Sequence, residues 1–147
     1  MRFEDVLAEF GRVSGLGELV LDDSGSCSLL FDGEHELNFV GGREDDAVFL
    51  YGIAGGAGTL RDAESCRSLL TASCLGAETG GAAFAQYGNS LILWKRHDRF
   101  VDYSALEKAV NDFLAQLIHW KEKLAAPPDS GPARSAPIDV PPEGIRI

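Results

Sequence analysis

LLTASCLGAETGGAAFAQYGNSLILWKR, residues 69–96, is the stretch that decides the fold. Its first residues complete a stripe of apolar and small side chains at helical spacing, which predicts a helix over 62–75. After the glycines, residues 82–87 and 90–96 predict two strands, and Gly88-Asn89 between them is typical of a tight hairpin turn. The stretch therefore predicts a helix that leads directly into a β-hairpin.

On the N-terminal side of this stretch, the sequence predicts another helix followed by strands. Apolar residues at positions 3, 6, 7, 10 and 13 have helical spacing, so this helix is expected to end near Gly15 or Gly17. Asp32-Gly33, between two apolar runs, favours a type I′ hairpin turn. Three or four short strands are expected, over 18–22, 27–31, 35–40 and 47–53.

On the C-terminal side, one long helix is expected. Ser104 and Glu107 have the spacing of a capping box. They precede a single apolar seam that consists of Leu106, Val110, Phe113, Leu117, Trp120 and Leu124. The complete order is α-βββ-α-ββ-α, which predicts an α+β fold with a twisted antiparallel sheet flanked by helices.

The predicted strands carry apolar side chains on both faces. Leu29, Leu30 and Phe31 are consecutive, and so are the four residues 48–51. A strand with one solvated face would instead alternate between apolar and polar residues. We therefore expect the second face of the sheet to meet a helix, a second subunit or a bound ligand.

Size, composition and charge limit the functional classes. The 147 residues favour one domain, and the net charge of −10 with a pI of about 4.6 disfavours nucleic acids and anionic membranes as partners. The sequence contains no apolar run of about 18–20 residues, and Glu4, Asp5 and Glu9 fall where a signal peptide needs an apolar core. The prediction is a cytoplasmic protein that does not insert into membranes.

Residues that could perform catalysis or bind metal do not form a recognisable motif. The histidines at 35, 97 and 119 are far apart in sequence, and Cys66 and Cys74 lack the spacing of a zinc or redox motif. The glycine group at 52–58 lacks the Lys-Ser/Thr ending of a phosphate loop, and the group at 78–82 lacks the helix that follows such a loop. We expect a binding protein with no catalytic residues, cofactor or metal. The alternative is a small enzyme that uses Cys27 or Cys66 with a histidine.

The last part of the chain differs in composition. All six prolines lie between Pro127 and Pro142. This contrast predicts a domain over 1–125 and a proline-rich, mostly disordered tail over 126–147. The simplest interpretation of the tail is a terminus without a structural role. The alternative is a docking peptide whose aliphatic residues are Ile138, Val140, Ile145 and Ile147.

Several segments, in this order, resemble the class I type III secretion chaperones of the Tir-chaperone family. They are GLGEL (15–19), LDDSGSCSLLFDG (21–33), VFLYGIAG (48–55), the stretch 69–96 and FLAQLIHWKEKL (113–124). Within 69–96, the match is to a Leu-Leu-x-Ala-Asn pattern that runs into Thr-Gly-Gly-Ala and then a Leu-x-Leu-Trp strand. Ser73 stands where that pattern usually has Asn.

The resemblance implies an ATP-independent homodimer in the bacterial cytosol. Such a chaperone binds the N-terminal segment of a secreted effector in extended form and keeps it soluble for secretion, a role in virulence. The secretion ATPase is a further partner that the resemblance suggests, and a non-secretion adaptor with the same fold is an alternative. The expected effector-binding residues are Val6, Phe10, Val13, Leu29, Phe31, Phe39, Leu50, Phe84, Leu91 and Leu93. The expected dimer interface contains Leu69, Leu70, Cys74 and Trp94.

Overall fold

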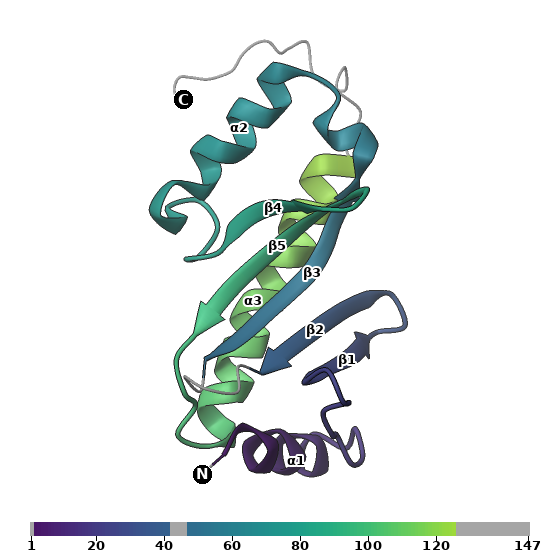
Figure 1. Ribbon diagram of the computed structural model, residues 1–147, viewed down its shortest axis with the longest axis vertical. Coiled ribbons are helices and arrows are strands. Elements are labelled where there is room, and N and C mark those ends of the chain that lie inside the picture. Colours follow the sequence, from purple (N-terminus) through teal and green to yellow (C-terminus); the bar gives the residue numbers. More distant parts are fainter. Residues whose placement is uncertain (1, 42–46, 126–147) are drawn as a thin grey trace.

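A computed structural model describes residues 2–41 and 47–125, with only the backbone at residue 57. The predicted tail over 126–147 lies outside the described residues. The observed order confirms the predicted α-βββ-α-ββ-α succession (Figure 1). The elements are α1 (Phe3–Val13), β1 (Ser26–Phe31), β2 (His35–Gly41), β3 (Val48–Gly56), the 3-10 helix η1 (Ala57–Leu60), α2 (Ala63–Ser73), the 3-10 helix η2 (Cys74–Gly76), β4 (Ala83–Tyr87), β5 (Ser90–His97) and α3 (Tyr103–Ala125).

The five strands form one antiparallel sheet with the order β1-β2-β3-β5-β4. The expected turn between β1 and β2 is present, because Asp32 and Gly33 have φ values of 54° and 69°. Between β4 and β5, Gly88 has a φ of 59°. The fold class predicted from the sequence, an α+β fold with an antiparallel sheet, is therefore confirmed.

One expected strand is absent from the described structure. Residues 18–22 precede β1 without regular secondary structure. The carboxylate of Asp22 accepts hydrogen bonds from the backbone N–H groups of Ser24 and Ser26, at 2.9 and 3.0 Å. These local bonds turn the chain into β1, so the segment before it does not pair with a strand.

The predicted start of the last helix is also corrected. The helix α3 begins at Tyr103, and its first turn is capped by Asp102, whose carboxylate accepts the N–H of Ala105 at 2.9 Å. Ser104 therefore lies inside the first turn, where it is exposed and does not cap the helix. A carboxylate next to the N-terminal end also interacts favourably with the helix dipole.

The helix α3 covers one face of the sheet and forms the core with it (Figure 1). Its buried residues are those of the predicted seam from Leu106 to Trp120. In β3, Val48 and Leu50 are buried towards this side, while Gly52 leaves room for Leu117. Because side chains alternate along a strand, the residues between them project from the opposite face of the sheet.

The other two α-helices lie at opposite ends of the molecule (Figure 1). The helix α1 packs against α3, and α2 packs beside the edge strand β4. The hydroxyl of Ser73 joins α2 to this strand, because it accepts the N–H of Phe84 at 2.9 Å and donates to the carbonyl of Leu69 at 2.8 Å. A serine at this position thus provides the hydrogen bond that holds α2 against the sheet.

Candidate binding surfaces

The sheet face opposite α3 carries an apolar cluster, which we call the outer sheet face. It consists of Phe49, Tyr51, Ile53, Ile92 and Trp94. The strand register places Tyr51 beside Trp94 and Ile53 beside Ile92, and the rings of Phe49 and Trp94 lie 6.1 Å apart. Ile53 is 47% exposed and the others are half-buried. The expectation of apolar side chains on both faces of the sheet is therefore confirmed, and no described α-helix packs over this cluster.

A second apolar surface follows α1, and we call it the α1 rim. Val13, Leu16 and Val20 are 49%, 42% and 65% exposed. Gly15 and Gly17, with φ values of 74° and 91°, turn the chain so that these side chains remain outside the core. An adjacent hollow of about 810 Å³ is lined by Ala8, Glu9, Arg12, Gly15, Gly17 and Glu18.

The exposed side of α2 and the turn after it form a third apolar surface. Leu70 is 71% exposed and Leu75 is 98% exposed. Leu75 also has a φ of 55°, a left-handed conformation that costs an L-residue roughly 1–2 kcal/mol. Cys74 is exposed beside it. A leucine with this exposure buries almost no apolar area in its own subunit, so its side chain is open to a partner.

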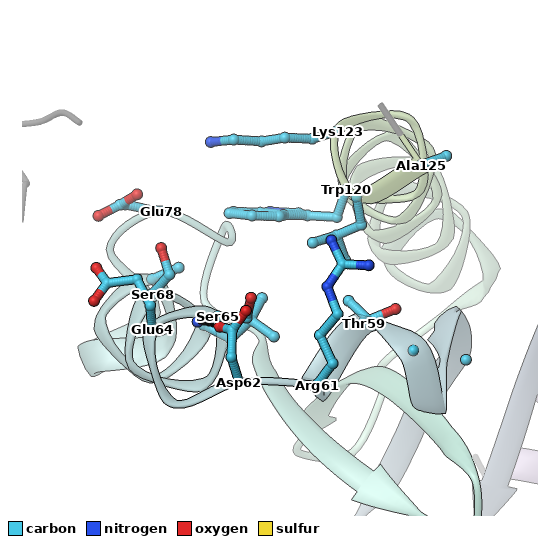
Figure 2. A pocket seen from close by; sticks show the side chains of 15 residues that line it. Thr59, Arg61, Asp62, Glu64, Ser65, Ser68, Glu78, Trp120, Lys123 and Ala125 are labelled. Atoms are coloured by element: carbon cyan, nitrogen blue, oxygen red, sulfur yellow. Dashed lines mark hydrogen bonds between the residues drawn. The ribbon is translucent and has the colours of Figure 1, made fainter. Parts of the chain in front are cut away.

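A groove of about 720 Å³ separates α2 and η1 from the C-terminal end of α3 (Figure 2). Its lining includes apolar side chains deep in the groove, namely Leu69, Ala72, Trp120 and Leu124, and charged residues around them, namely Arg61, Asp62, Glu64, Glu78 and Lys123. Asp62 also caps α2 by accepting the N–H of Ser65 at 2.7 Å, and this hydrogen bond lowers the pKa of the carboxyl group.

Most of the residues expected to bind an effector are buried in the hydrophobic core of the subunit. The sequence could not separate core residues from binding residues, because a buried stripe and a binding stripe have the same periodicity. Val13 alone of the expected set is exposed, while Phe31 and Phe84 are partly buried against the core. The expected residues that are buried in the core are Val6, Phe10, Leu29, Phe39, Leu50, Leu91 and Leu93.

The residues expected at the dimer interface divide between core and surface. Leu69 is 5% exposed and packs inside its own subunit. Trp94 belongs to the outer sheet face, and Leu70 and Cys74 are exposed on the third surface. The uncovered apolar surfaces also contain residues outside the expected sets, namely Leu16, Val20, Tyr51, Ile53, Leu75 and Ile92. The consecutive apolar residues in β3 were a signal for part of this set, but spacing could not identify the exposed members.

The titratable side chains of the described residues do not gather into one site. His97 packs on Phe100, with ring centroids 5.2 Å apart, and burial lowers its pKa. Among residues 2–41 and 47–125, no hydrogen bond links a cysteine to a histidine, and no group of three or more His, Cys, Asp and Glu side chains is arranged to bind a metal ion. Burial also raises the pKa of the Cys27 thiol, which disfavours the reactive thiolate. No helix within the described ranges is long and apolar enough to span a membrane.

A small α+β subunit with several uncovered apolar surfaces belongs to the class of proteins that bind other polypeptides. The model of the Tir chaperone protein (CesT) family matches residues 5–121. The chain therefore belongs to this family, which confirms the resemblance found in the sequence. No curated protein gives a significant match to it.

Solved structures share the fold at low sequence identity. The chain is similar to one in the ExsC-ExsE complex, with 20% identity, a TM-score of 0.71, and coverage of 84% of this chain and 97% of that chain. A chain in the HopA1-SchA chaperone-effector complex is 18% identical, with a TM-score of 0.69 and coverage of 82% of this chain and 93% of that chain. The structure of the Yersinia pestis type III secretion chaperone SycH with a fragment of YscM2 is 15% identical, with a TM-score of 0.61 and coverage of 80% of this chain and 98% of that chain.

Proposed function

We propose that this protein is a type III secretion chaperone that acts in the bacterial cytoplasm. Two copies would form a homodimer that binds the N-terminal segment of a secreted effector in extended form. The observation that carries the proposal is the exposure of separate apolar surfaces on a subunit whose family is a chaperone family. The solved complexes of ExsC with ExsE and of SchA with HopA1 support it, because they pair a chain of this fold with another protein.

The outer sheet face is the proposed dimer contact. Trp94 and Ile53 lie on adjacent strands, and a rotation by 180° would bring the same surface of a second copy against them. Leu70 on α2 and Cys74, the first residue of η2, extend this contact. Aromatic and aliphatic side chains that are half-exposed in one subunit become buried in such an interface, where they contribute most of the binding free energy.

The α1 rim is the proposed contact for the effector. Val13, Leu16 and Val20 present separate aliphatic side chains, as an extended segment with alternating apolar residues requires. If such a segment buries ~1,000 Å² of apolar area, the gross hydrophobic stabilisation is about 25 kcal/mol. Most of it is offset by the ordering of the bound segment, and no ATP hydrolysis is needed for binding.

Co-expression with effectors encoded nearby tests this proposal. We expect a stable complex of two chaperone subunits and one effector, detected by light scattering after size-exclusion chromatography. An effector that lacks its N-terminal region serves as the control and should not bind. A chaperone that stays monomeric and captures no effector would contradict the proposal. A measurable turnover that thiol alkylation abolishes would instead support the cysteine-dependent enzyme.

A further inference from the structure

The groove between α2 and α3 contains a buried polar atom that needs a partner. The side chain of Trp120 is only 5% exposed, and its indole Nε1 has no hydrogen-bond acceptor among the described residues. A buried donor without an acceptor is strongly unfavourable, so such groups are almost always paired in folded proteins. The acceptor of Trp120 is therefore expected from a group outside residues 2–41 and 47–125.

Aromatic side chains and a lysine surround the ring of Trp120, and His119 also lies edge-on to it, with ring centroids 5.6 Å apart. Phe84 packs edge-on against the indole ring, with ring centroids 5.0 Å apart, and Nζ of Lys123 lies 4.7 Å from the centroid of the Trp120 ring. Figure 2 shows that Trp120 and Lys123 both extend from α3 towards Glu78, across the groove. A ligand in the groove would thus meet the edge of the indole ring, the lysine and the acidic side chain together.

The chain itself continues from the rim of this groove. Ala125, the last residue of α3, is part of the lining, and residues 126–147 follow it in the sequence. A segment attached at the rim has a high effective concentration in the groove, in the millimolar range for a short flexible connection. Of the parts of the chain outside the described ranges, only this one begins at the groove.

The composition of residues 127–140 suits such a groove. The segment contains Pro127, Pro128, Pro132 and Pro137, and it ends with the alternating aliphatic residues Ile138 and Val140. Proline-rich segments lack internal hydrogen bonds, so their carbonyl groups are free to accept from an indole N–H. Recognition of this kind commonly takes place in grooves lined by aromatic side chains. Arg134 in the segment is complementary to Glu64 and Glu78 on the opposite wall.

We propose that the groove between α2 and α3 is the docking site of the chain's own residues 127–140. One of the carbonyl groups of this segment accepts the hydrogen bond of Trp120 Nε1, and the aliphatic residues contact Leu69, Ala72 and Leu124. This docking does not depend on the proposed function.

Hydrogen exchange in the full-length protein tests the proposal. The indole N–H signals of Trp94 and Trp120, and the amides of α2, are compared between the wild type and a full-length variant with Pro127→Gly, Pro128→Gly, Ile138→Ser and Val140→Ser. We expect the Trp120 indole and the α2 amides to exchange about tenfold faster in the variant. A matched variant, Ile145→Ser with Ile147→Ser, should exchange like the wild type.

A synthetic peptide of residues 127–140 provides the second measurement. It should restore protection in the four-substitution variant and change little in the wild type, where the groove is already occupied. Equal exchange in all three proteins, or no effect of the peptide on the variant, would overturn the proposal. Protection that depends on protein concentration would assign the groove to a second copy, and protection only with an effector would assign it to the client. Effector capture is measured separately, so the two proposals can fail independently.

Discussion

Gly76 and Gly81 touch through their backbones at the turn between α2 and β4. A Cβ on Gly76 would lie 2.3 Å from the Cα of Gly81, and the N–H of Gly81 donates to the carbonyl of Gly76 at 3.0 Å. Gly76 also has a φ of 68°. This contact turns the chain from the helix into the hairpin, and it explains why residues 69–96 have glycine at both positions.

The first prediction concerns this contact. Gly76→Ala adds a clash with backbone to a strained φ, so we expect the free energy of unfolding to decrease by about 2–4 kcal/mol. Gly88→Ala is the matched control, because Gly88 has a φ of 59° and open space around it. The control should lose only about 1–2 kcal/mol. Urea denaturation measures both, and equal losses would show that the close contact does not contribute.

The second prediction concerns the hydroxyl of Ser73. Ser73→Ala leaves the N–H of Phe84 without its acceptor, and we expect a loss of about 1–2 kcal/mol in the free energy of unfolding. Ser73→Asn, the residue usual in the family pattern, retains an acceptor and should lose less than half as much. Thermal denaturation compares the three proteins. A larger loss for the asparagine variant would mean that the site accommodates only a hydroxyl.

The third prediction tests the outer sheet face as the dimer contact. Trp94→Ala and Ile53→Asp should each weaken self-association by about tenfold or more, because both remove apolar area from the proposed interface. Val101→Asp is the control, since this residue is 76% exposed in the segment between β5 and α3. Sedimentation over a concentration series measures the association. An unchanged dimer in both interface variants would remove the outer sheet face from the proposal.

The fourth prediction separates effector binding from dimerisation. Leu16→Asp and Val20→Asp place charges in the α1 rim, where both side chains are exposed, so the fold should remain intact. We expect effector affinity to fall by about tenfold for each change, while the dimer persists. Phe10→Ala is not a suitable probe, because Phe10 is buried and its loss would destabilise the core. Isothermal titration with the effector segment provides the measurement, and unaltered affinity would place the contact elsewhere.

The fifth prediction is a dependence of stability on pH that arises from His97. Burial, with a smaller contribution from Lys95, lowers the pKa of His97 below its ordinary value of 6.5, while Asp98 acts in the opposite direction. The unfolded chain therefore binds a proton more readily than the folded one. The contribution of the neutral, buried His97 to the free energy of unfolding is complete above pH 6.5. Stability should decrease as the pH falls from 6.5 towards the lowered pKa of His97.

His97→Phe tests this origin of the pH dependence. The variant keeps the ring contact with Phe100 and removes the titrating group, so the change in urea midpoint between about pH 7.5 and about pH 5 should become smaller. His119→Gln is the control, since His119 is exposed on α3. If His119→Gln reduces the pH dependence as much as His97→Phe does, the assignment to the buried histidine is wrong.

The sequence predicted the order of the elements because that order depends on local patterns. Helical spacing identified α1 and α3, and Asp32-Gly33 identified a turn that requires two positive φ values. The strand expected at 18–22 was wrong because Asp22 forms hydrogen bonds with its own neighbours, which apolar spacing does not reveal. The start of α3 was displaced for a similar reason, since Asp102 competes with Ser104 as the capping residue.

By itself, the sequence determined the fold class, the family and the absence of a recognisable catalytic motif. Only the tertiary structure decided which apolar residues are core and which are surface. Phe39 and Tyr51 show the physical reason: both belong to apolar strands, but one faces α3 and is fully buried, while the other faces away from it and is half-exposed. Periodicity fixes which residues share a face of a strand, whereas the packing of α3 decides which of the two faces is covered.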